Sequence, residues 1–114
     1  MSLSTERLGT IILRELVHIV NEEIKNDLVG YYTLTETRVT KDLSFCTIYY
    51  TILSDDKEVI EMANNLLEKN KKSIRMKLAS KIRKARKIPE LIFKYDEALA
   101  YGNHIDNLLK EIKK

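Results

Sequence analysis

The sequence predicts a single α+β domain in which a three-stranded sheet packs against helices. The 114 residues suffice for one hydrophobic core but not for two domains, so residues 1–114 are expected to form one unit. Apolar residues recur at helical spacing in several segments and at alternate positions in others. The expected order is helix, strand, strand, helix, helix, strand, helix, with the helices covering one face of the sheet.

The first helix is predicted from apolar residues spaced three or four positions apart, a pattern that places one side of a helix on a core. This stripe consists of Leu8, Ile12, Leu16, Ile19, Val20 and Ile24. Asn26 and Asp27 favour a turn, and glycine accepts the left-handed conformation that closes a helix. The helix is therefore expected to end near Gly30.

Two strands are predicted in residues 31–53, where Tyr, Thr, Val, Ile and Phe are frequent and the hydrophobic repeat shortens to two. The polar residues 40–42 favour a tight turn between them. Alternate side chains of a strand point to opposite faces of its sheet. The core set is predicted to be Cys46, Ile48, Tyr50 and Ile52, and the opposite set Phe45, Thr47, Tyr49 and Thr51.

The second half of the chain predicts two helices, a strand and a final helix. Asp55, with Glu58 three residues later, resembles a cap for the first of these helices. Pro89 is expected to stop the second, because its ring clashes with the preceding turn. A strand follows in residues 91–95, and a helix from about residue 97 to the end. The apolar stripes of the three helices are Val59, Ile60, Ala63, Leu66 and Leu67, then Ile74, Leu78, Ile82 and Ala85, and finally Ala98, Tyr101, Ile105, Leu108, Leu109 and Ile112.

Composition excludes several classes of protein. No apolar run approaches the roughly 20 residues that a membrane span needs, and the first residues lack the pattern of a signal peptide. The single cysteine, Cys46, cannot form an internal disulfide and is interpreted as a small buried hydrophobe. These features predict a cytoplasmic protein that does not bind membranes.

Residues that carry catalysis are scarce. His18 and His104 are interpreted as surface or boundary residues of helices rather than as general bases. Asp55 and Asp56 are interpreted as helix caps rather than as a cation site. None of the three glycines lies in a phosphate-binding loop. These residues give little support to catalysis, and nucleotide hydrolysis in particular is not expected. We also expect no metal, no cofactor and no small-molecule substrate.

The strongest functional signal is the segregation of charge. The net charge is only +3, but residues 69–87 hold ten Lys and Arg and no acid, which leaves a net charge of −7 elsewhere. Cations without acidic neighbours repel one another unless a polyanion or distant acids neutralise them. This segment therefore predicts a nucleic-acid surface that recognises mainly backbone phosphates. The predicted RNA-binding residues are Lys69, Lys71, Lys72, Arg75, Lys77, Lys81, Arg83, Lys84, Arg86 and Lys87, flanked by Arg38 and Lys41 near the strand turn.

Other interpretations remain open at this point. The basic face could be merely solvated, or could belong to a protein-interaction or regulatory module that meets an acidic partner. Phe45 and Tyr49 are placed either to stack on bases or to serve as half-exposed sheet aromatics. An enzyme that acts on RNA through His18 or His104 is a third candidate.

Several motifs together resemble one known family over essentially the whole chain, the ribosome-binding factor A family. VTKDLS at residues 39–44, followed by IYYT at residues 48–51, resembles the strand–turn–strand of this family. The pairs IR at 74–75, LA at 78–79 and IR at 82–83 resemble its basic helix. The most specific match is PELIFKYD at residues 89–96, followed by Gly102, Ile105 and Leu108.

This resemblance implies a type II KH-like domain, in which two helices joined by a kink form the RNA-contacting region. Asn70, Lys71 and Lys72 occupy the position of the kink, where the family commonly has Ala-x-Gly. The resemblance also implies a non-catalytic factor that binds the free 30S subunit and its 16S rRNA. Late maturation and 5′-end processing of 16S rRNA, growth at low temperature and a monomeric state are the further expectations.

Overall fold

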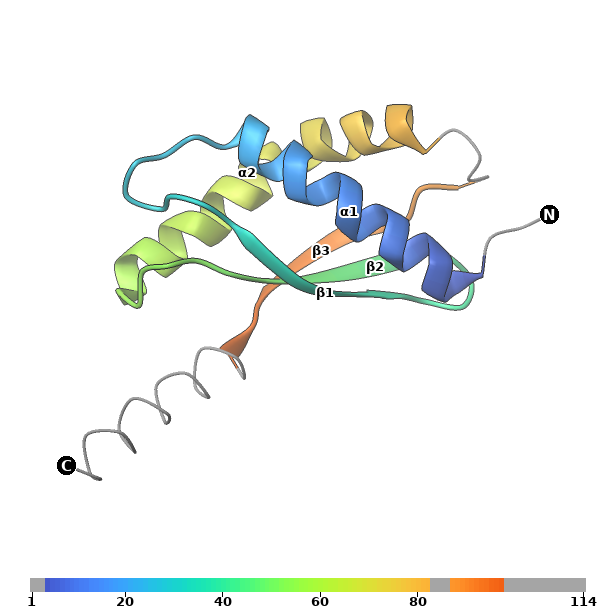
Figure 1. Cartoon of the computed structure of the whole chain (residues 1–114), viewed down its shortest axis with the longest axis horizontal. Coiled ribbons are helices and arrows are strands. Elements are labelled where there is room, and N and C mark those ends of the chain that lie inside the picture. Colours follow the sequence, from blue (N-terminus) through green and yellow to red (C-terminus); the bar gives the residue numbers. More distant parts are fainter. Residues whose placement is uncertain (1–3, 83–86, 98–114) are drawn as a thin grey trace, which may run out of the picture.

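The computed structural model describes residues 4–82 and 87–97, and these residues confirm the predicted α+β class. The elements are α1 (Thr5–Glu23), β1 (Thr33–Val39), β2 (Phe45–Thr51), α2 (Lys57–Lys81) and β3 (Glu90–Tyr95), as Figure 1 shows. The final predicted helix falls on residues 98–114, outside the described residues. Neither described helix is long and apolar enough to cross a membrane.

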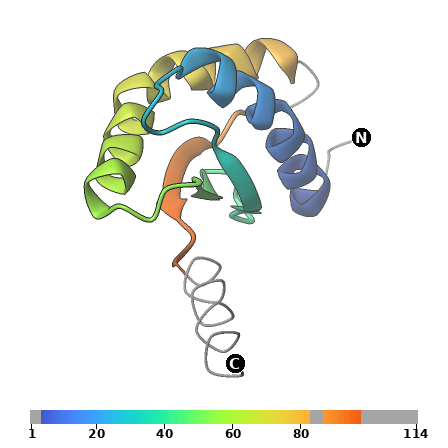
Figure 2. The same ribbon diagram turned by 60° about the vertical axis from the view of Figure 1, so that its left-hand side comes forward.

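The three strands form one sheet in the order β1-β2-β3, with β1 antiparallel and β3 parallel to β2. Helix α2 connects β2 to β3 and so supplies the long crossover that parallel neighbours require. Both helices cover the same face of the sheet, and no described element covers the other (Figures 1 and 2). The predicted layering is therefore confirmed for the two described helices.

The core lies between the sheet and the two helices. Cys46, Ile48 and Tyr50 are fully buried there, and Ile52 is nearly so, which confirms the face predicted for the second strand. The Tyr50 ring lies 5.8 Å from the ring of Tyr32, another fully buried tyrosine. The remaining core residues are Leu8, Ile12, Leu16, Ile19, Val20, Ile24, Val29, Ala63, Leu67, Ile74, Leu78, Ile82, Leu91 and Phe93.

Helix α1 begins with Ser4, whose hydroxyl oxygen accepts a hydrogen bond from the backbone N–H of Arg7. It ends at Glu23, so the prediction of an end near Gly30 was wrong. The cause is a tertiary contact: the side chain of Asn21 bonds to both the N–H and the carbonyl of Tyr32, at 2.8 and 3.0 Å. These bonds hold the returning chain beside the last turn of α1. Gly30, at φ 70°, instead serves the loop that follows.

Helix α2 is continuous where two helices and a kink were predicted. Asn70 stays helical, and its Nδ2 donates to the carbonyl of Leu66 at 2.8 Å. No glycine is present here, and lysine is a good helix former, so Lys71 and Lys72 continue the helix. Figure 2 shows the helix arching over the sheet without a break.

Both ends of α2 also differ from the prediction. The cap is Asp56 rather than Asp55, since its carboxylate accepts from the N–H of Glu58 at 2.9 Å. The helix ends at Lys81, eight residues before Pro89, so this proline does not terminate it. The backbone N–H of Ile82 still bonds to the carbonyl of Leu78 at 3.0 Å and closes the last turn.

Candidate nucleic-acid interface

The C-terminal half of α2 carries most of the described residues predicted to bind RNA. Ile74 and Leu78 are fully buried and mark the side of this half that faces the core. The end of α1 lies against one flank, and the chain just before β3 lies against the other. Successive helical residues are about 100° apart, so the basic side chains meet three different surroundings.

Lys77 lies on the flank next to α1 and forms an ion pair with Glu23, the last residue of that helix. The hydroxyl of Ser73 donates to the other carboxylate oxygen of Glu23 at 2.6 Å. These two hydrogen bonds, that of Lys77 first, hold the pKa of Glu23 below its usual value. The charge of Lys77 is therefore compensated by its own protein.

Lys71 has an acidic partner on α2 itself. Its Nζ lies 2.9 Å from a carboxylate oxygen of Glu68, three residues earlier, and both side chains are partly exposed. Exposed pairs of this kind are weak, at about 0.2–1 kcal/mol. Lys71 can therefore exchange Glu68 for a phosphate at little cost.

Arg75 lies on the flank next to β3 and binds backbone. Its Nη2 donates to the carbonyl of Ile88 at 2.6 Å, and its Nε donates to the carbonyl of Pro89 at 3.2 Å. These bonds tie the middle of α2 to the two residues that lead into β3. The structure thus gives Arg75, predicted as a central RNA contact, a role in positioning the chain.

The outward side of α2 presents cations with no such partners. Lys69 and Lys72 are exposed there, and so is Met76, at 65%. Lys81, at the helix end, and Lys87, ahead of β3, are exposed as well. Within residues 4–82 and 87–97, these four lysines form no ion pair; we call them the exposed lysines. The remaining predicted contacts, Arg83, Lys84 and Arg86, lie outside the described residues.

Lys41 lies in the turn between β1 and β2, and side chains fix the shape of this turn. The hydroxyl of Thr40 accepts from the N–H groups of Ser44 and Phe45, both at 3.1 Å, and donates to Asp42 at 2.8 Å. The hydrogen bonds from Thr40 and Ser44 lower the pKa of the Asp42 carboxyl to about 2. The exposed Lys41 therefore projects from a well-defined turn.

The turn lies at the same end of the sheet as the start of β3. The N–H of Glu90 donates to the carbonyl of Ser44 at 2.9 Å, and Phe45 is paired with Glu90. Figure 1 shows the end of α2 reaching this end of the molecule too. The structure thus brings Lys41, Lys81 and Lys87 to one end of the domain.

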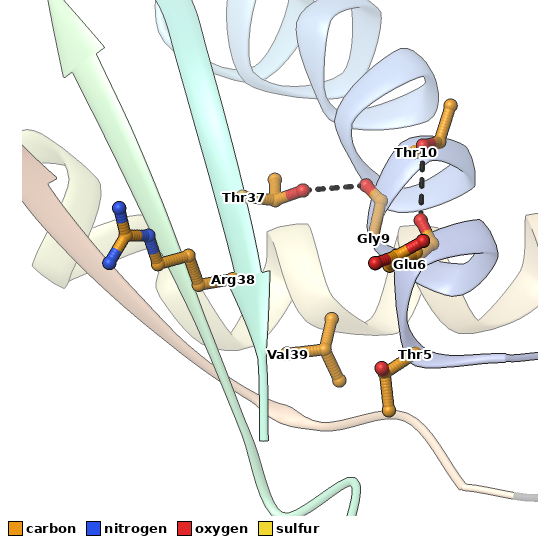
Figure 3. A pocket seen from close by; sticks show the side chains of 7 residues that line it. All are labelled: Thr5, Glu6, Gly9, Thr10, Thr37, Arg38 and Val39. Atoms are coloured by element: carbon orange, nitrogen blue, oxygen red, sulfur yellow. Dashed lines mark hydrogen bonds between the residues drawn. The ribbon is translucent and has the colours of Figure 1, made fainter. Parts of the chain in front are cut away.

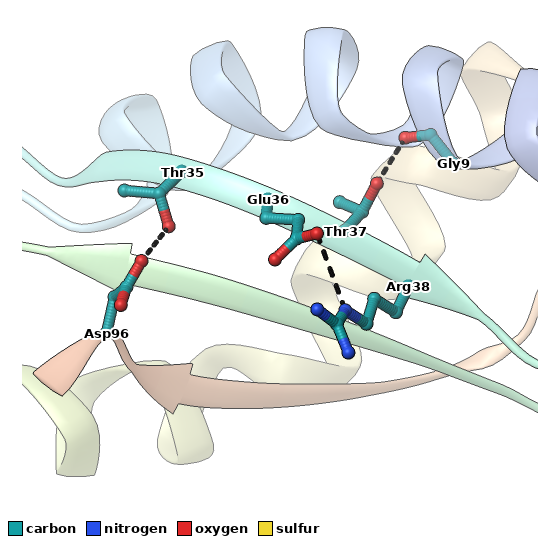
Figure 4. A network of polar contacts seen from close by, with 6 residues as sticks. All are labelled: Gly9, Thr35, Glu36, Thr37, Arg38 and Asp96. Carbon is teal, nitrogen blue, oxygen red and sulfur yellow. Dashed lines mark hydrogen bonds and ion pairs between the residues drawn. The ribbon is translucent and has the colours of Figure 1, made fainter. Parts of the chain in front are cut away.

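Arg38, the other flanking candidate, lies elsewhere. It projects from the sheet face opposite the helices, whereas its neighbour Thr37 points toward α1 (Figure 4). Its Nε lies 3.4 Å from a carboxylate oxygen of Glu36, and its guanidinium carbon 5.8 Å from the centre of the Tyr49 ring. Arg38 is therefore not part of the same surface as α2.

His18, His104 and the acidic residues were the candidates for catalysis and metal binding. His18 is exposed on α1, as predicted, whereas His104 is outside the described residues. No three His, Cys, Asp or Glu residues in the described ranges are placed to hold a metal ion. A hollow between α1 and β1 (Figure 3) is lined by Gly9 and Thr37, whose hydroxyl donates to the Gly9 carbonyl at 2.8 Å. A Cβ at Gly9 would lie 3.0 Å from that hydroxyl, so glycine serves close packing here.

The charge pattern allows for distant acids but does not identify which residues outside the basic segment are the partners. Glu68 lies one residue before the segment, at i,i+3 from Lys71, and could have been recognised from spacing alone. Glu23 is 54 residues from Lys77, and the partners of Arg75 are backbone carbonyls. No local pattern in the sequence marks such contacts.

Comparison with solved structures supports the fold. The crystal structure of ribosome-binding factor A from Thermus thermophilus is similar, with a TM-score of 0.69, 20% identity, and coverage of 82% of this chain and 97% of that one. A homology model of the T. thermophilus factor, fitted into a cryo-EM map of a 30S–RbfA complex, gives a TM-score of 0.60 at 21% identity. It covers 76% of this chain and 93% of that one.

Comparison with known sequences establishes the family. The family model for ribosome-binding factor A matches residues 4–109. Ribosome-binding factor A of Phytoplasma mali is 51% identical over the full length of both chains. That of Macrococcus caseolyticus is 40% identical, over all of this chain and 98% of the relative. The resemblance predicted from the motifs is thus confirmed, and the chain belongs to the ribosome-binding factor A family.

Proposed function

We propose that this protein is a non-catalytic assembly factor that binds the free 30S ribosomal subunit through its 16S rRNA. The observation that carries the proposal is the set of exposed lysines, Lys69, Lys72, Lys81 and Lys87, which no acid of the described chain neutralises. Phosphate groups are the abundant anions of rRNA and suit such a surface. The relative fitted into a map of a 30S–RbfA complex supports the same partner.

The proposed mode of action is occupancy of an immature site. A bound protein shifts an equilibrium between rRNA arrangements only by its differential affinity for them. Assistance in late maturation and in 5′-end processing of 16S rRNA, including at low temperature, would follow from favouring one arrangement. The protein would act in the cytoplasm as a monomer, without a cofactor or a small-molecule substrate.

The four exposed lysines set the expected strength of the electrostatic contribution. If each reaches one phosphate, the association constant falls with salt at a log–log slope of about −3, from roughly 0.7–0.9 per contact. Lys41 adds a fifth contact if the β1–β2 turn also meets RNA. Arg75 and Lys77 contribute little to this slope because they already have partners within the protein.

Charge reversal of Lys69, Lys72 and Lys81 tests the proposal by co-sedimentation with 30S particles. None of the three makes a described ion pair, so the triple Glu variant should keep its fold. The matched control reverses three exposed lysines elsewhere, Lys25, Lys57 and Lys94, and changes the net charge equally. We expect the first variant to lose 30S binding and the control to retain most of it.

Two outcomes would contradict the proposed interface. A third outcome would contradict the proposed lack of catalysis. Equal binding by both triple variants and the wild type would show that the exposed lysines do not form the interface. An association with ribosomal particles that survives complete RNase digestion would favour the alternative of a basic-faced protein-interaction module. Cleavage of precursor rRNA by the purified protein would contradict its non-catalytic character.

A further inference from the structure

Two loops of the domain expose large apolar side chains. The first loop joins α1 to β1, and the second joins β2 to α2. Leu28 is 65% exposed and Tyr31 53% exposed in the first loop, and Leu53 is 90% exposed in the second. These are three of the five exposed large apolar side chains within residues 4–82 and 87–97. Exposed apolar surface that is concentrated in one region is typical of an interaction site.

The pairing of β1 with β2 brings the two loops together. Thr33 is paired with Thr51 at the end of the ladder, with Tyr31 two residues before the one and Leu53 two residues after the other. Two residues span at most about 7 Å, so both side chains lie near this pair. Figure 1 shows the two loops at the same end of the molecule, opposite the C-terminal end of α2. We call Leu28, Tyr31 and Leu53 the loop patch.

The first loop holds its apolar side chains in a fixed position. The Oδ1 atom of Asn26 accepts hydrogen bonds from the N–H groups of Leu28 and Val29, at 2.9 and 3.1 Å. Val29 and Tyr32, which follow the two exposed residues, are buried. The hydroxyl of Tyr32 also donates to a backbone carbonyl of α2 at 2.7 Å. A partner would therefore lose little conformational entropy in ordering this loop.

Acidic side chains flank the loop patch. Asp27 adjoins Leu28 in the chain, and Asp55 follows Leu53 by two residues. Both carboxylates are exposed, and neither forms an ion pair within the described residues. Residues 52–58 as a whole hold three acids and one base. Such a surface repels phosphate and attracts lysine and arginine, and an apolar centre with a charged rim is typical of protein–protein interfaces.

We propose that the loop patch docks a Lys/Arg-rich segment, with at least one apolar side chain, of a protein in the small ribosomal subunit. This inference rests on the proposed function, because the exposed lysines bring the domain to the particle. The two ends of the domain then contact different macromolecules, RNA at the exposed lysines and protein at the loop patch. Two separate contacts fix the orientation of the domain more firmly than one.

Photocrosslinking to purified 30S particles tests the two contacts separately. Leu53→p-benzoylphenylalanine places a photoreactive group in the loop patch and keeps the position apolar. Met76→p-benzoylphenylalanine places the same group on the outward side of α2, among the exposed lysines. We expect the probe at position 53 to crosslink to a ribosomal protein, at a peptide of net positive charge identified by mass spectrometry. The probe at position 76 should crosslink to 16S rRNA.

Neutralisation of the flanking acids tests the charge complementarity. Asp27→Asn together with Asp55→Asn should lower the yield of the protein crosslink by about threefold or more and leave the RNA crosslink unchanged. The matched control combines Glu6→Gln with Glu90→Gln, which removes the same charge from exposed acids in the first turn of α1 and at the start of β3. The control should change neither crosslink.

Several results would overturn the proposal. A probe at position 53 that crosslinks to rRNA, within its own chain or to a second copy would assign the loop patch to that occupant. Equal protein yields for the neutralised variant and its control would exclude recognition by charge. A silent probe at position 53 with an RNA crosslink at position 76 would refute the loop patch alone, whereas silence at both positions would also contradict the proposed function. Circular dichroism verifies folding, and Leu28→p-benzoylphenylalanine offers a second position if the first variant unfolds.

Discussion

Two variants, Arg75→Met and Lys72→Met, together distinguish a positioning role of Arg75 from an RNA-binding role. Each removes one positive charge from α2, and Lys72 lies on the outward side of this helix. Arg75→Met deletes two charge-assisted hydrogen bonds, of 2.6 Å to the carbonyl of Ile88 and 3.2 Å to that of Pro89. Lys72 is exposed and forms no ion pair with any described residue. The two variants therefore differ mainly in the contacts made within the protein.

The expected loss of stability follows from these two bonds. Hydrogen bonds to charged groups contribute about 1.5–3 kcal/mol each when they are well shielded. Arg75 is exposed, so water can replace it at both carbonyls, and we expect Arg75→Met to lower the free energy of unfolding by about 1–2 kcal/mol in total. For a domain of this size, that lowers Tm by roughly 3–8 °C. Lys72→Met should change the free energy of unfolding by less than about 0.5 kcal/mol.

The same pair of variants should behave in the opposite way in RNA binding. Lys72→Met removes one phosphate contact and should reduce the magnitude of the salt slope by about 0.7–0.9. Arg75→Met should leave that slope unchanged at a temperature where both variants are folded. Urea unfolding and salt titrations of binding to 30S particles provide the two measurements. If Arg75→Met proves as stable as wild type while its salt slope decreases, the assignment of Arg75 as a positioning residue is wrong.

Three further changes test other contacts. Tyr32→Phe removes a buried 2.7 Å hydrogen bond to a backbone carbonyl of α2 and should lower the free energy of unfolding by about 1–1.5 kcal/mol in urea denaturation. The pKa of the Asp42 carboxyl is lowered to about 2, so its carboxylate stabilises the β1–β2 turn fully above the ordinary pKa of about 4, and this stabilisation should be lost as pH falls toward 2. The amide chemical shifts of the turn, followed by NMR, should report this pH dependence, and Asp42→Asn should abolish it. A midpoint near pH 4 in the wild type would contradict the assignment. Glu23→Gln should release Lys77 and steepen the salt slope of RNA binding by up to about 0.9. The control is Glu22→Gln, an exposed neighbour whose replacement removes the same charge without releasing a lysine. Equal salt slopes for these two variants would show that Lys77 does not reach RNA.

The features that the sequence predicted correctly are those that local periodicity determines. The alternation of Cys46, Ile48 and Tyr50 with their outward neighbours assigns the two faces of β2, because a strand has a fixed period of two. The end of α1 could not be predicted in this way. It depends on Asn21 and Tyr32, which are 11 residues apart and meet only after the chain has reversed.

The partners of individual cations could not be predicted for a related reason. Counting charges along residues 69–87 finds every cation but not the surroundings of each one. Lys77 and Arg75 lie on the two flanks of α2, so a packed neighbour supplies a partner to each. Only the position of a residue around the helix, together with what packs on each side, distinguishes these two from Lys69 and Lys72.

The charges along α2 serve its stability and its orientation at the same time. Its first twelve residues contain three Glu and one Lys, and its last thirteen contain six Lys or Arg and no acid. Acids near the N-terminus and cations near the C-terminus both interact favourably with the helix dipole, by about 0.3–1 kcal/mol for each well-placed group. The same gradient gives the domain one cationic end, where the β1–β2 turn and the start of β3 also lie. A polyanion would therefore attract this end and repel the acidic start of α2, which favours a single docking orientation even though the net charge of the chain is only +3.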